Sequence, residues 1–334
     1  MADNSGWKRP VRVGFFYDFD LTLTEEFQQY PIFRKFLSQL RGKYGERIQR
    51  PDDYWSLCEG GDLAVKWMER FLSDSGDVFG HEENGEIVGL TNRQMREEFA
   101  PLIKLAPGLP SWFGRLKKRA SSLGIEAENH MITSGIVPLV AGSQISPYLT
   151  SIVGGEFLDN GKGIYQASSI VEPSRKVEHF KRICKGEDIY ANLPHDGYHI
   201  NYRDSFYFGD GQSDRDLSRY LKQRGGVSVG VYKPGDKNSF DKCFSVLGSE
   251  NPGESHVSLI LPRDYSEGSI LEKKIFSVLD SMAGSGIGCD MDWELVHKWK
   301  LNQIRSREVS KNVEAHFNSC SLCQEKYKTD FVFG

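Results

Sequence analysis

The sequence has no apolar run long enough to cross a membrane and no marked excess of charge of one sign. Nowhere among its 334 residues do about 18 apolar residues follow one another, which excludes an ordinary membrane-spanning helix. Lysine and arginine number 42 and aspartate and glutamate 46, so the net charge is −4. No basic field would attract nucleic acid or anionic lipid. We therefore expect neither a nucleic-acid partner nor a membrane partner.

Cysteine is also scarce, and a secretion signal is not evident. The 6 cysteines do not have the spacing of a disulfide framework, so they are better interpreted as thiols or metal ligands. The first ten residues are polar and precede only a short apolar stretch, without the long apolar segment of a signal peptide. These features favour a cytoplasmic protein. Hydrophobic residues make up 39% and charged residues 26%, as in an ordinary globular protein.

Short apolar segments that end in glycine or polar turns alternate with amphipathic stretches. Val11–Tyr17 is nearly all apolar, which is typical of a strand covered on both faces of a parallel sheet. Further strands are predicted at 130–133, 205–208, 227–232 and 257–262, and helices at 111–122, 176–184 and 269–282. Alternating strands and helices predict an α/β fold with a Rossmann-like, doubly wound parallel sheet. In such sheets, ligands bind beyond the carboxyl ends of the strands.

The composition changes after the first strand. Residues 24–105 are rich in helix formers and aromatic side chains without a clear strand pattern, so we expect an inserted helical unit. Pro107-Gly-Leu-Pro110 marks the return to the sheet, and Asn160-Gly161 predicts a hairpin within 156–165. A glycine-rich linker is expected at 283–288. The predicted units are an α/β core of 1–23 and 106–282, a helical insertion of 24–105 and a C-terminal module of 283–334.

Acidic residues follow two of the predicted strands. Asp18 and Asp20 lie one residue apart at the end of the first strand. Adjacent carboxylates repel unless a divalent cation or a proton lies between them, although such a pair also fits a capped turn. Gly209-Asp-Gly-Gln-Ser-Asp214 follows another strand, and its glycines allow a ligand to approach the backbone. Two acidic strand ends in one sheet predict an oxygen-lined Mg²⁺ site that a substrate phosphate completes.

Groups that could bind phosphoryl oxygens occur at two further places. His130-Met-Ile-Thr-Ser134-Gly135 ends a predicted strand in a hydroxyl and a glycine amide. Lys176 begins an amphipathic helix from which its ammonium could reach a phosphate, although such a lysine is more often a surface residue. The alternatives are Thr133 in place of Ser134, and Lys181 or Arg175 in place of Lys176.

With these motifs in this order, residues from about Arg12 to Ile270 resemble the haloacid dehalogenase superfamily, specifically its phosphoserine-phosphatase-like branch. The resemblance implies a phosphatase in which Asp18 becomes an aspartyl phosphate and Asp20 is the general acid and base. The implied Mg²⁺ ligands are Asp18, Asp20 through its backbone carbonyl, Asp210 and Asp214. The implied phosphate-binding residues are Thr22, Ser134, Gly135 and Lys176.

The helical insertion resembles the cap of that family, which closes over the site and selects the leaving group. Phosphoserine phosphatases bind the substrate amine with a glutamate shortly after the first motif. Glu25 and Glu26 are nearby but also fit a helix amino terminus, and the corresponding register falls nearest Phe27. Ile136 follows Gly135 where those enzymes have a second glycine. The implied substrate is a small phosphorylated metabolite, and phosphoserine is left open.

Two further questions concern the leaving group and the reaction. Four aromatic residues of the insertion could line a pocket for an apolar or aromatic leaving group, or could form the core of the cap: Tyr30, Tyr54, Trp55 and Trp67. A dehalogenase is disfavoured because that chemistry needs no acid to protonate an alkoxide, and Asp20 is present. Transfer of the phosphoryl group to a second alcohol stays open.

A second metal site is predicted in the C-terminal module. His316-Phe-Asn-Ser-Cys320-Ser-Leu-Cys323 places three ligands on one face of a helix, and Cys289 could be the fourth, with His297 in reserve. The stretch resembles the zinc-binding fold of anti-sigma factors, which implies a structural Zn²⁺ and a docking site for a protein partner. Such docking could go with phosphoprotein phosphatase or phosphotransferase activity. The alternative is a helix with two buried thiols and a surface histidine.

Overall fold

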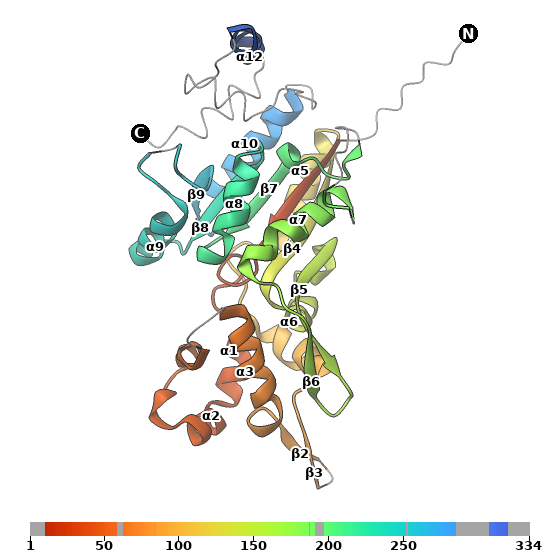
Figure 1. Cartoon of the computed structure of the whole chain (residues 1–334), viewed down its shortest axis with the longest axis vertical. Coiled ribbons are helices and arrows are strands. Elements are labelled where there is room, and N and C mark those ends of the chain that lie inside the picture. Colours follow the sequence, from red (N-terminus) through yellow and green to blue (C-terminus); the bar gives the residue numbers. More distant parts are fainter. Residues whose placement is uncertain are drawn as a thin grey trace, which may run out of the picture.

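The larger part of the molecule is built around a seven-stranded sheet with the strand order β6-β5-β4-β1-β7-β8-β9 (Figure 1). The structure is a computed structural model that describes residues 11–58, 63–83, 85–186, 188–190, 197–251, 253–284 and 307–319. The strands are β1 (Val11–Tyr17), β4 (Ile125–Ile136), β5 (Ser151–Asp159), β6 (Ile164–Ser169), β7 (Ser205–Gly209), β8 (Val227–Tyr232) and β9 (Leu259–Pro262). All neighbours pair in parallel except β5 and β6. The predicted α/β sheet is confirmed.

Helices cover both faces of this sheet (Figure 1). They are α5 (Ser111–Ser122) and α10 (Ile270–Gly284) on one face, and α7 (Lys176–Lys185) and α8 (Arg215–Lys222) on the other, with α9 (Lys237–Leu247) beside β8. Successive β1 side chains point to opposite faces. Phe15 therefore belongs to the large core with α5, whereas Phe16 packs against Phe180 of α7 at a ring-centroid distance of 4.8 Å. Burial on both sides explains why β1 and β7 are almost wholly apolar.

A smaller unit follows β1 and lies beyond the carboxyl ends of the strands, at the bottom of Figure 1. Its elements are α1 (Tyr30–Lys35), α2 (Leu37–Tyr44), a 3₁₀ helix (Pro51–Cys58), α3 (Leu63–Asp77), β2 (His81–Glu83), β3 (Glu86–Val88) and α4 (Asn92–Gln94). We call it the cap. The β2–β3 hairpin corrects the prediction that this region has no strand. Its strands have three residues each, which is too short for a visible alternation.

The chain enters and leaves the cap through two adjacent segments. The backbone N–H of Glu25 donates to the carbonyl of Lys104 (2.8 Å), and that of Ala106 donates to Leu23 (2.9 Å). The predicted hairpin at Asn160-Gly161 is confirmed, with longer strands than predicted, and it extends to the cap. There the ring of Phe157 stacks on Phe71 at 5.9 Å. The hairpin of the core therefore completes the hydrophobic core of the cap.

Two further helices are the short α6 (Val137–Ala141) after β4 and α12 (Arg307–Ser319) in the C-terminal module. α12 includes the backbone of His316, but its side chain lies outside the described residues, as do Cys289, His297, Cys320 and Cys323. α10 continues through Gly284, so the predicted linker begins later than 283. Within the described part of the chain, no helix has both the length and the apolar content that a membrane span requires.

Candidate active site

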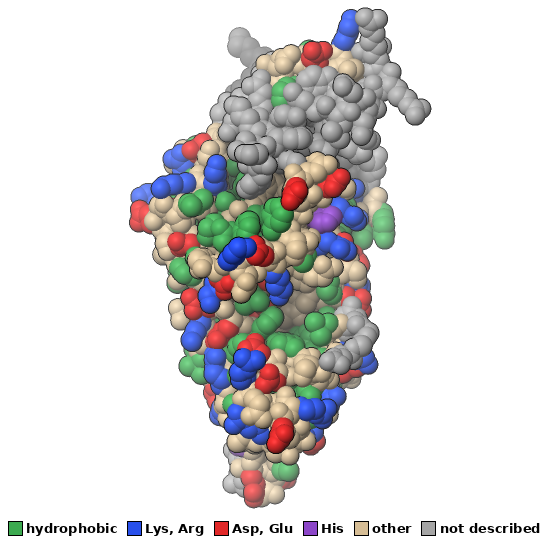
Figure 2. All heavy atoms as spheres, turned by 90° about the vertical axis from the view of Figure 1, so that its left-hand side faces the viewer, with side chains coloured by type: hydrophobic (Ala, Val, Ile, Leu, Met, Phe, Trp, Pro, Cys, Tyr) green, Lys and Arg blue, Asp and Glu red, His purple; other side chains and the backbone are tan. Residues whose placement is uncertain are grey.

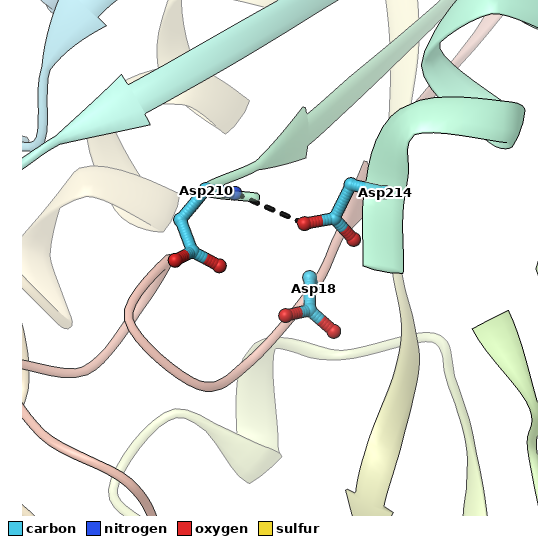
Figure 3. Close-up of side chains that lie close together, drawn as sticks. All are labelled: Asp18, Asp210 and Asp214. Atoms are coloured by element: carbon cyan, nitrogen blue, oxygen red, sulfur yellow. Dashed lines mark hydrogen bonds between the residues drawn. The ribbon is translucent and has the colours of Figure 1, made fainter. Parts of the chain in front are cut away.

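The parallel register of β1 and β7 places two acidic strand ends side by side. Tyr17 pairs with Phe208, and the next residue, Asp18, donates its backbone N–H to the carbonyl of Phe208 (2.9 Å). Asp210 follows the last residue of β7. Single carboxylate oxygens of Asp18, Asp210 and Asp214 all lie within 4.8 Å of one another (Figure 3). Asp18 is only 4% exposed, so these charges meet in a largely dry environment.

Asp214, just before α8, is held by four hydrogen bonds. Its Oδ2 accepts the backbone N–H groups of Asp210 (3.0 Å, dashed in Figure 3) and Gly211 (3.2 Å). Its Oδ1 accepts the hydroxyl of Tyr207 (2.6 Å) and the ammonium of Lys176 (2.7 Å). Both oxygens are therefore occupied, and Asp214 fixes the loop that carries Asp210 and orients Lys176.

Lys176, the first residue of α7, is fully buried between two of the acids. Its Nζ donates to Asp18 Oδ1 (2.8 Å) as well as to Asp214. Burial alone would lower the pKa of this ammonium, but the two carboxylates raise the pKa above its usual value and keep the group charged. The alternative cations lie elsewhere: Lys181 sits over the Tyr220 ring, 5.0 Å from its centroid, and Arg175 pairs with Glu178.

The cluster carries more negative than positive charge. Burial, with a smaller contribution from the Asp214 carboxylate, raises the pKa of Asp18 to about 7, against the lowering effect of Lys176. Burial and the two neighbouring carboxylates raise the pKa of Asp210 well above its usual value. Among the described residues, no side chain donates a hydrogen bond to the Asp210 carboxylate. Hard oxygen donors with uncompensated charge fit Mg²⁺.

Asp20 is fixed by Gln28, a residue that the sequence patterns did not indicate. The backbone N–H of Gln28 donates to Oδ1 of Asp20 (2.6 Å), and its side-chain amide donates to Oδ2 (2.9 Å). Burial raises the pKa of Asp20 to about 6, and the hydrogen bonds from Gln28 limit the rise. Gln28 also accepts the N–H of Ile136 (3.1 Å). A Cβ at Gly135 would lie 1.6 Å from the Gln28 amide, so only glycine fits there.

The turn between Asp20 and Thr22 is strained and is held from β9. Leu21 has a φ of 56°, a left-handed conformation that costs a non-glycine residue about 1 kcal/mol. The guanidinium of Arg263 donates to the carbonyl of Leu21, and the hydroxyl of Tyr265 donates to that of Thr22 (3.1 Å). The Thr22 side chain is fully buried and does not line the cavity described below, so the structure does not bring it to the predicted phosphate position.

The end of β4 provides one available hydroxyl. Ser134 lines the cavity, and its Oγ has no hydrogen-bond partner among the described residues. Thr133 also lines the cavity, but its Oγ1 accepts the backbone N–H of Gly135 (3.0 Å). The Gly135 amide is thus engaged within its own strand, unlike the predicted free donor. Ser134 is therefore the better placed of the two hydroxyls.

A cavity of about 430 Å³ lies between the core and the cap, and Asp18, Asp20 and Asp210 are among the residues that line it. Figure 2 shows hydrophobic side chains around the hollow in this face. Of the four aromatic candidates, Trp55 and Trp67 line the cavity, whereas Tyr30 and Tyr54 are buried in the cap and donate to Asp52 and Asp74. The candidates Glu25 and Glu26 are not lining residues, and Glu26 pairs with Arg34. Phe27 lines the cavity instead.

No protein-family model matches the sequence, and no curated protein matches it. Solved structures that resemble the chain include haloacid dehalogenase superfamily hydrolases. A phospho-aspartyl intermediate analogue of phosphoserine phosphatase has a TM-score of 0.44 and 11% identity, covering 79% of this chain and 98% of that one. A haloacid dehalogenase-like hydrolase from Streptococcus pneumoniae has a TM-score of 0.42 and 12% identity, and the match covers 79% of this chain and 98% of that one. An L-2-haloacid dehalogenase has a TM-score of 0.41 and 12% identity, and the match covers 80% of this chain and 99% of that one. Such low scores do not decide between the phosphatase and dehalogenase reactions.

Proposed function

We propose that this protein is a Mg²⁺-dependent phosphomonoester hydrolase with Asp18 as its nucleophile. The observation that carries the proposal is the position of Asp18. Its carboxylate lines the cavity between core and cap, it accepts a hydrogen bond from the buried Lys176, and one of its oxygens lies within 4.8 Å of one oxygen of Asp210. The nucleophile Asp18, the ammonium of Lys176 and the carboxylate of Asp210 thus lie together at a cavity that a phosphoryl group could enter.

The reaction we infer has two steps. Lys176 donates one hydrogen bond to Oδ1 of Asp18, so Oδ2 is the oxygen that attacks phosphorus, and the second lone pair of Oδ1 is the one that would contact Mg²⁺. The phosphorus–oxygen bond to the leaving group breaks as the bond to Asp18 forms, and Asp20 donates a proton to the departing alkoxide. Water then attacks phosphorus of the aspartyl phosphate and gives a proton back to Asp20. Inorganic phosphate leaves, and the Asp18 carboxylate is restored.

The environment of Asp20 suits both of its proposed roles. With its pKa raised to about 6 by burial, the carboxyl can give and recover a proton near neutral pH. The two hydrogen bonds from Gln28 hold the Asp20 carboxylate in place, and Asp20 lines the cavity. Ser134 and Lys176 are the proposed donors to phosphoryl oxygens, where negative charge grows in the transition state.

The donor set for the metal is narrower than the sequence implied. We infer that Asp18, Asp210 and the backbone carbonyl of Asp20 would hold Mg²⁺, whereas the four hydrogen bonds of Asp214 occupy the lone pairs of both its oxygens, so that it acts by orienting its neighbours. When bound, the ion neutralises charge on the phosphoryl group.

The test is hydrolysis of 4-nitrophenyl phosphate by the purified chain with Mg²⁺ and with EDTA. We expect Mg²⁺-dependent hydrolysis and a loss of at least about a thousandfold in kcat for Asp18→Asn. Asp216→Asn, a half-exposed acid on α8, is the matched control and should keep the wild-type rate. Equal rates for wild type and Asp18→Asn would reject the proposal. Halide release from a 2-haloacid without phosphatase activity would assign the dehalogenase reaction instead.

The zinc site of the C-terminal module and its protein-docking role stay proposals. α12 includes the backbone of His316, whereas Cys320 and Cys323 lie outside the described residues. We expect one Zn²⁺ per chain in the purified protein and loss of that ion in Cys320→Ser. Unchanged zinc content in the variant would reject the ligand set. A soluble cytoplasmic location and a small phosphorylated substrate complete the proposal.

A further inference from the structure

The cavity above Asp18 has two chemically different walls. The core wall carries the acids, hydroxyls and the cation Lys242, whereas the cap wall is apolar and aromatic. Among the described residues, the cap contributes Phe27, Gln29, Trp55, Leu63, Ala64 and Trp67 to the lining. None of these side chains is ionisable. A charged leaving group would lose its hydration in the cavity without gaining a partner from these residues.

The aromatic side chains of the cap wall form a continuous group. The ring centroids of Phe27 and Trp55 are 5.0 Å apart, and those of Trp55 and Trp67 are 6.0 Å apart with nearly perpendicular planes. Leu63, at the start of α3, lines the same cavity and is 56% exposed. A leucine this exposed is not core packing. Large apolar groups that meet at a cavity are the usual contact for a flat apolar ligand.

Two neutral polar atoms of this wall, Gln29 Oε1 and Trp55 Nε1, have no hydrogen-bond partner among the described residues. Gln29 itself is only 1% exposed. A buried amide oxygen without a partner costs free energy unless a ligand or water donates to it. It can accept a hydroxyl or N–H group but cannot neutralise a charge.

We propose that the leaving group is a neutral alcohol with an aromatic or similarly flat apolar body, bound against Phe27, Trp55 and Trp67. This inference rests on the proposed phosphatase function. It names the substrate class as phosphomonoesters of aromatic or aryl-alkyl alcohols and excludes small zwitterionic phosphates. In this arrangement the phosphate lies on the acids of the core, the ring lies on the cap, and Gln29 accepts a hydrogen bond from one uncharged substituent.

Intrinsic reactivity must not be mistaken for recognition, so the experiment compares phosphates of alcohols with similar acidity. We expect kcat/KM to be at least about tenfold higher for benzyl phosphate than for ethyl phosphate, because one ring is transferred from water to the apolar wall. We expect 2-aminoethyl phosphate to be the poorest of the three. A benzyl-to-ethyl ratio near one, or an ammonium substrate that equals benzyl phosphate, would overturn the inference while leaving the phosphatase function intact.

Variants then locate the ring. Trp67→Leu and Phe27→Leu should each lower the benzyl-to-ethyl ratio of kcat/KM by about fivefold or more, chiefly through a higher KM for benzyl phosphate. Tyr165→Leu, an aromatic side chain 55% exposed on β6 that does not line the cavity, is the control and should leave the ratio unchanged. Unchanged ratios in both cavity variants would reject this location for the ring.

A binding measurement keeps the two proposals separable. Benzylphosphonate and ethylphosphonate cannot be hydrolysed at their carbon–phosphorus bond, and their affinities for the wild-type chain with Mg²⁺ are measured by calorimetry. We expect benzylphosphonate to bind about tenfold more tightly, and Trp67→Leu to remove most of this difference. If no ester is hydrolysed but this preference holds, the phosphatase function fails and the ligand class stands. Equal affinities would overturn the ligand class.

Discussion

Two groups of carboxylates occur in the same sheet, and they differ in how their charge is balanced. Near the amino end of β4, Glu128 faces Arg12 (2.6 Å), His130 (3.1 Å) and His199 (3.0 Å). Burial would raise the pKa of Glu128, but hydrogen bonds from the two histidines lower it to about 2. At the carboxyl ends, Asp18 and Asp214 share Lys176, no described side chain donates a hydrogen bond to the Asp210 carboxylate, and burial raises the pKa of Asp18 to about 7.

The difference shows what a functional acid looks like in this fold. An acid surrounded by donors, such as Glu128, lowers the free energy of the native state and has no capacity left for a ligand. Acids with too few donors, such as Asp210, are held together at a free-energy cost that a cation or a phosphoryl complex can relieve. Four substitutions test this contrast, from the largest expected effect to the smallest.

Lys176→Met removes the cation that is hydrogen-bonded to both Asp18 and Asp214. Because Asp18 and Asp214 would then be buried without it, we expect the free energy of unfolding to fall by about 3–5 kcal/mol and hydrolysis to be lost. Urea unfolding followed by circular dichroism measures the first effect. Lys181→Met, on the same helix, should change stability by less than about 0.5 kcal/mol. Similar losses in both variants would show that the helix, and not the cluster, is responsible.

Glu128→Gln should be destabilising at neutral pH, by about 1–2 kcal/mol after allowance for partial solvent screening. The native pKa of Glu128, about 2, lies below its unfolded value of 4.5, so its stabilisation is complete above pH 4.5 and is lost as the pH falls toward 2. Urea midpoints between pH 3 and pH 7 measure it. The difference between wild type and variant should shrink over the acidic half of that range, and a constant difference would contradict the charge balance described here.

Asp210→Asn also replaces a carboxylate by an amide, but it should raise the free energy of unfolding, whereas Glu128→Gln lowers it. The pKa of Asp210 is raised above its unfolded value, so ionisation of this group costs stability, and the cost grows as the pH rises through the native pKa. Without Mg²⁺ at pH 8 we expect the variant to be more stable by about 1 kcal/mol or more. Mg²⁺ should raise the melting temperature of the wild type but not of the variant. A destabilised, Mg²⁺-responsive variant would refute the assignment of Asp210 as a ligand.

Gln28→Ala should have the smallest effect. Water can replace the side-chain donor to Asp20, so we expect kcat for benzyl phosphate to fall by only about three- to fivefold, with KM nearly unchanged. Steady-state kinetics at pH 6 to 8 provide the measurement. Gln94→Ala is a control outside the site, because that glutamine caps α4. A large KM effect would place Gln28 in substrate binding rather than in positioning Asp20.

Local sequence patterns were sufficient to predict the sheet, the shared acidic site and one hairpin. The apolar strands predict the sheet because burial on both faces leaves little room for polar residues. The acids after β1 and β7 predict a shared site because the carboxyl ends of parallel strands meet at one edge. Asn160-Gly161 predicts its hairpin because the turn needs φ above zero, and Gly161 has a φ of 83°.

Other features have no local signal. β4 begins at Ile125, earlier than predicted, because its polar residues Glu126 and Glu128 are neutralised by Arg12 of β1. Gln28 and Arg263 are ordinary polar residues by composition, and only the approach of β4 and β9 to the first motif makes them supports of Asp20 and Leu21. No spacing rule identifies the contact of Gln28 with Ile136, 108 residues later, or that of Arg263 with Leu21, 242 residues earlier.

The aromatic residues of the cap show the limit most directly. In sequence, Tyr54 and Trp55 are neighbours, but Tyr54 is buried against Asp74 while Trp55 lines the cavity. The sequence by itself determined the α/β sheet, the inserted unit and the acidic strand ends, because hydrophobic periodicity and turn chemistry act over a few residues. Only the tertiary structure decided which lysine balances the acids and which aromatic rings face the site. Those choices depend on packing between segments that are far apart in the chain.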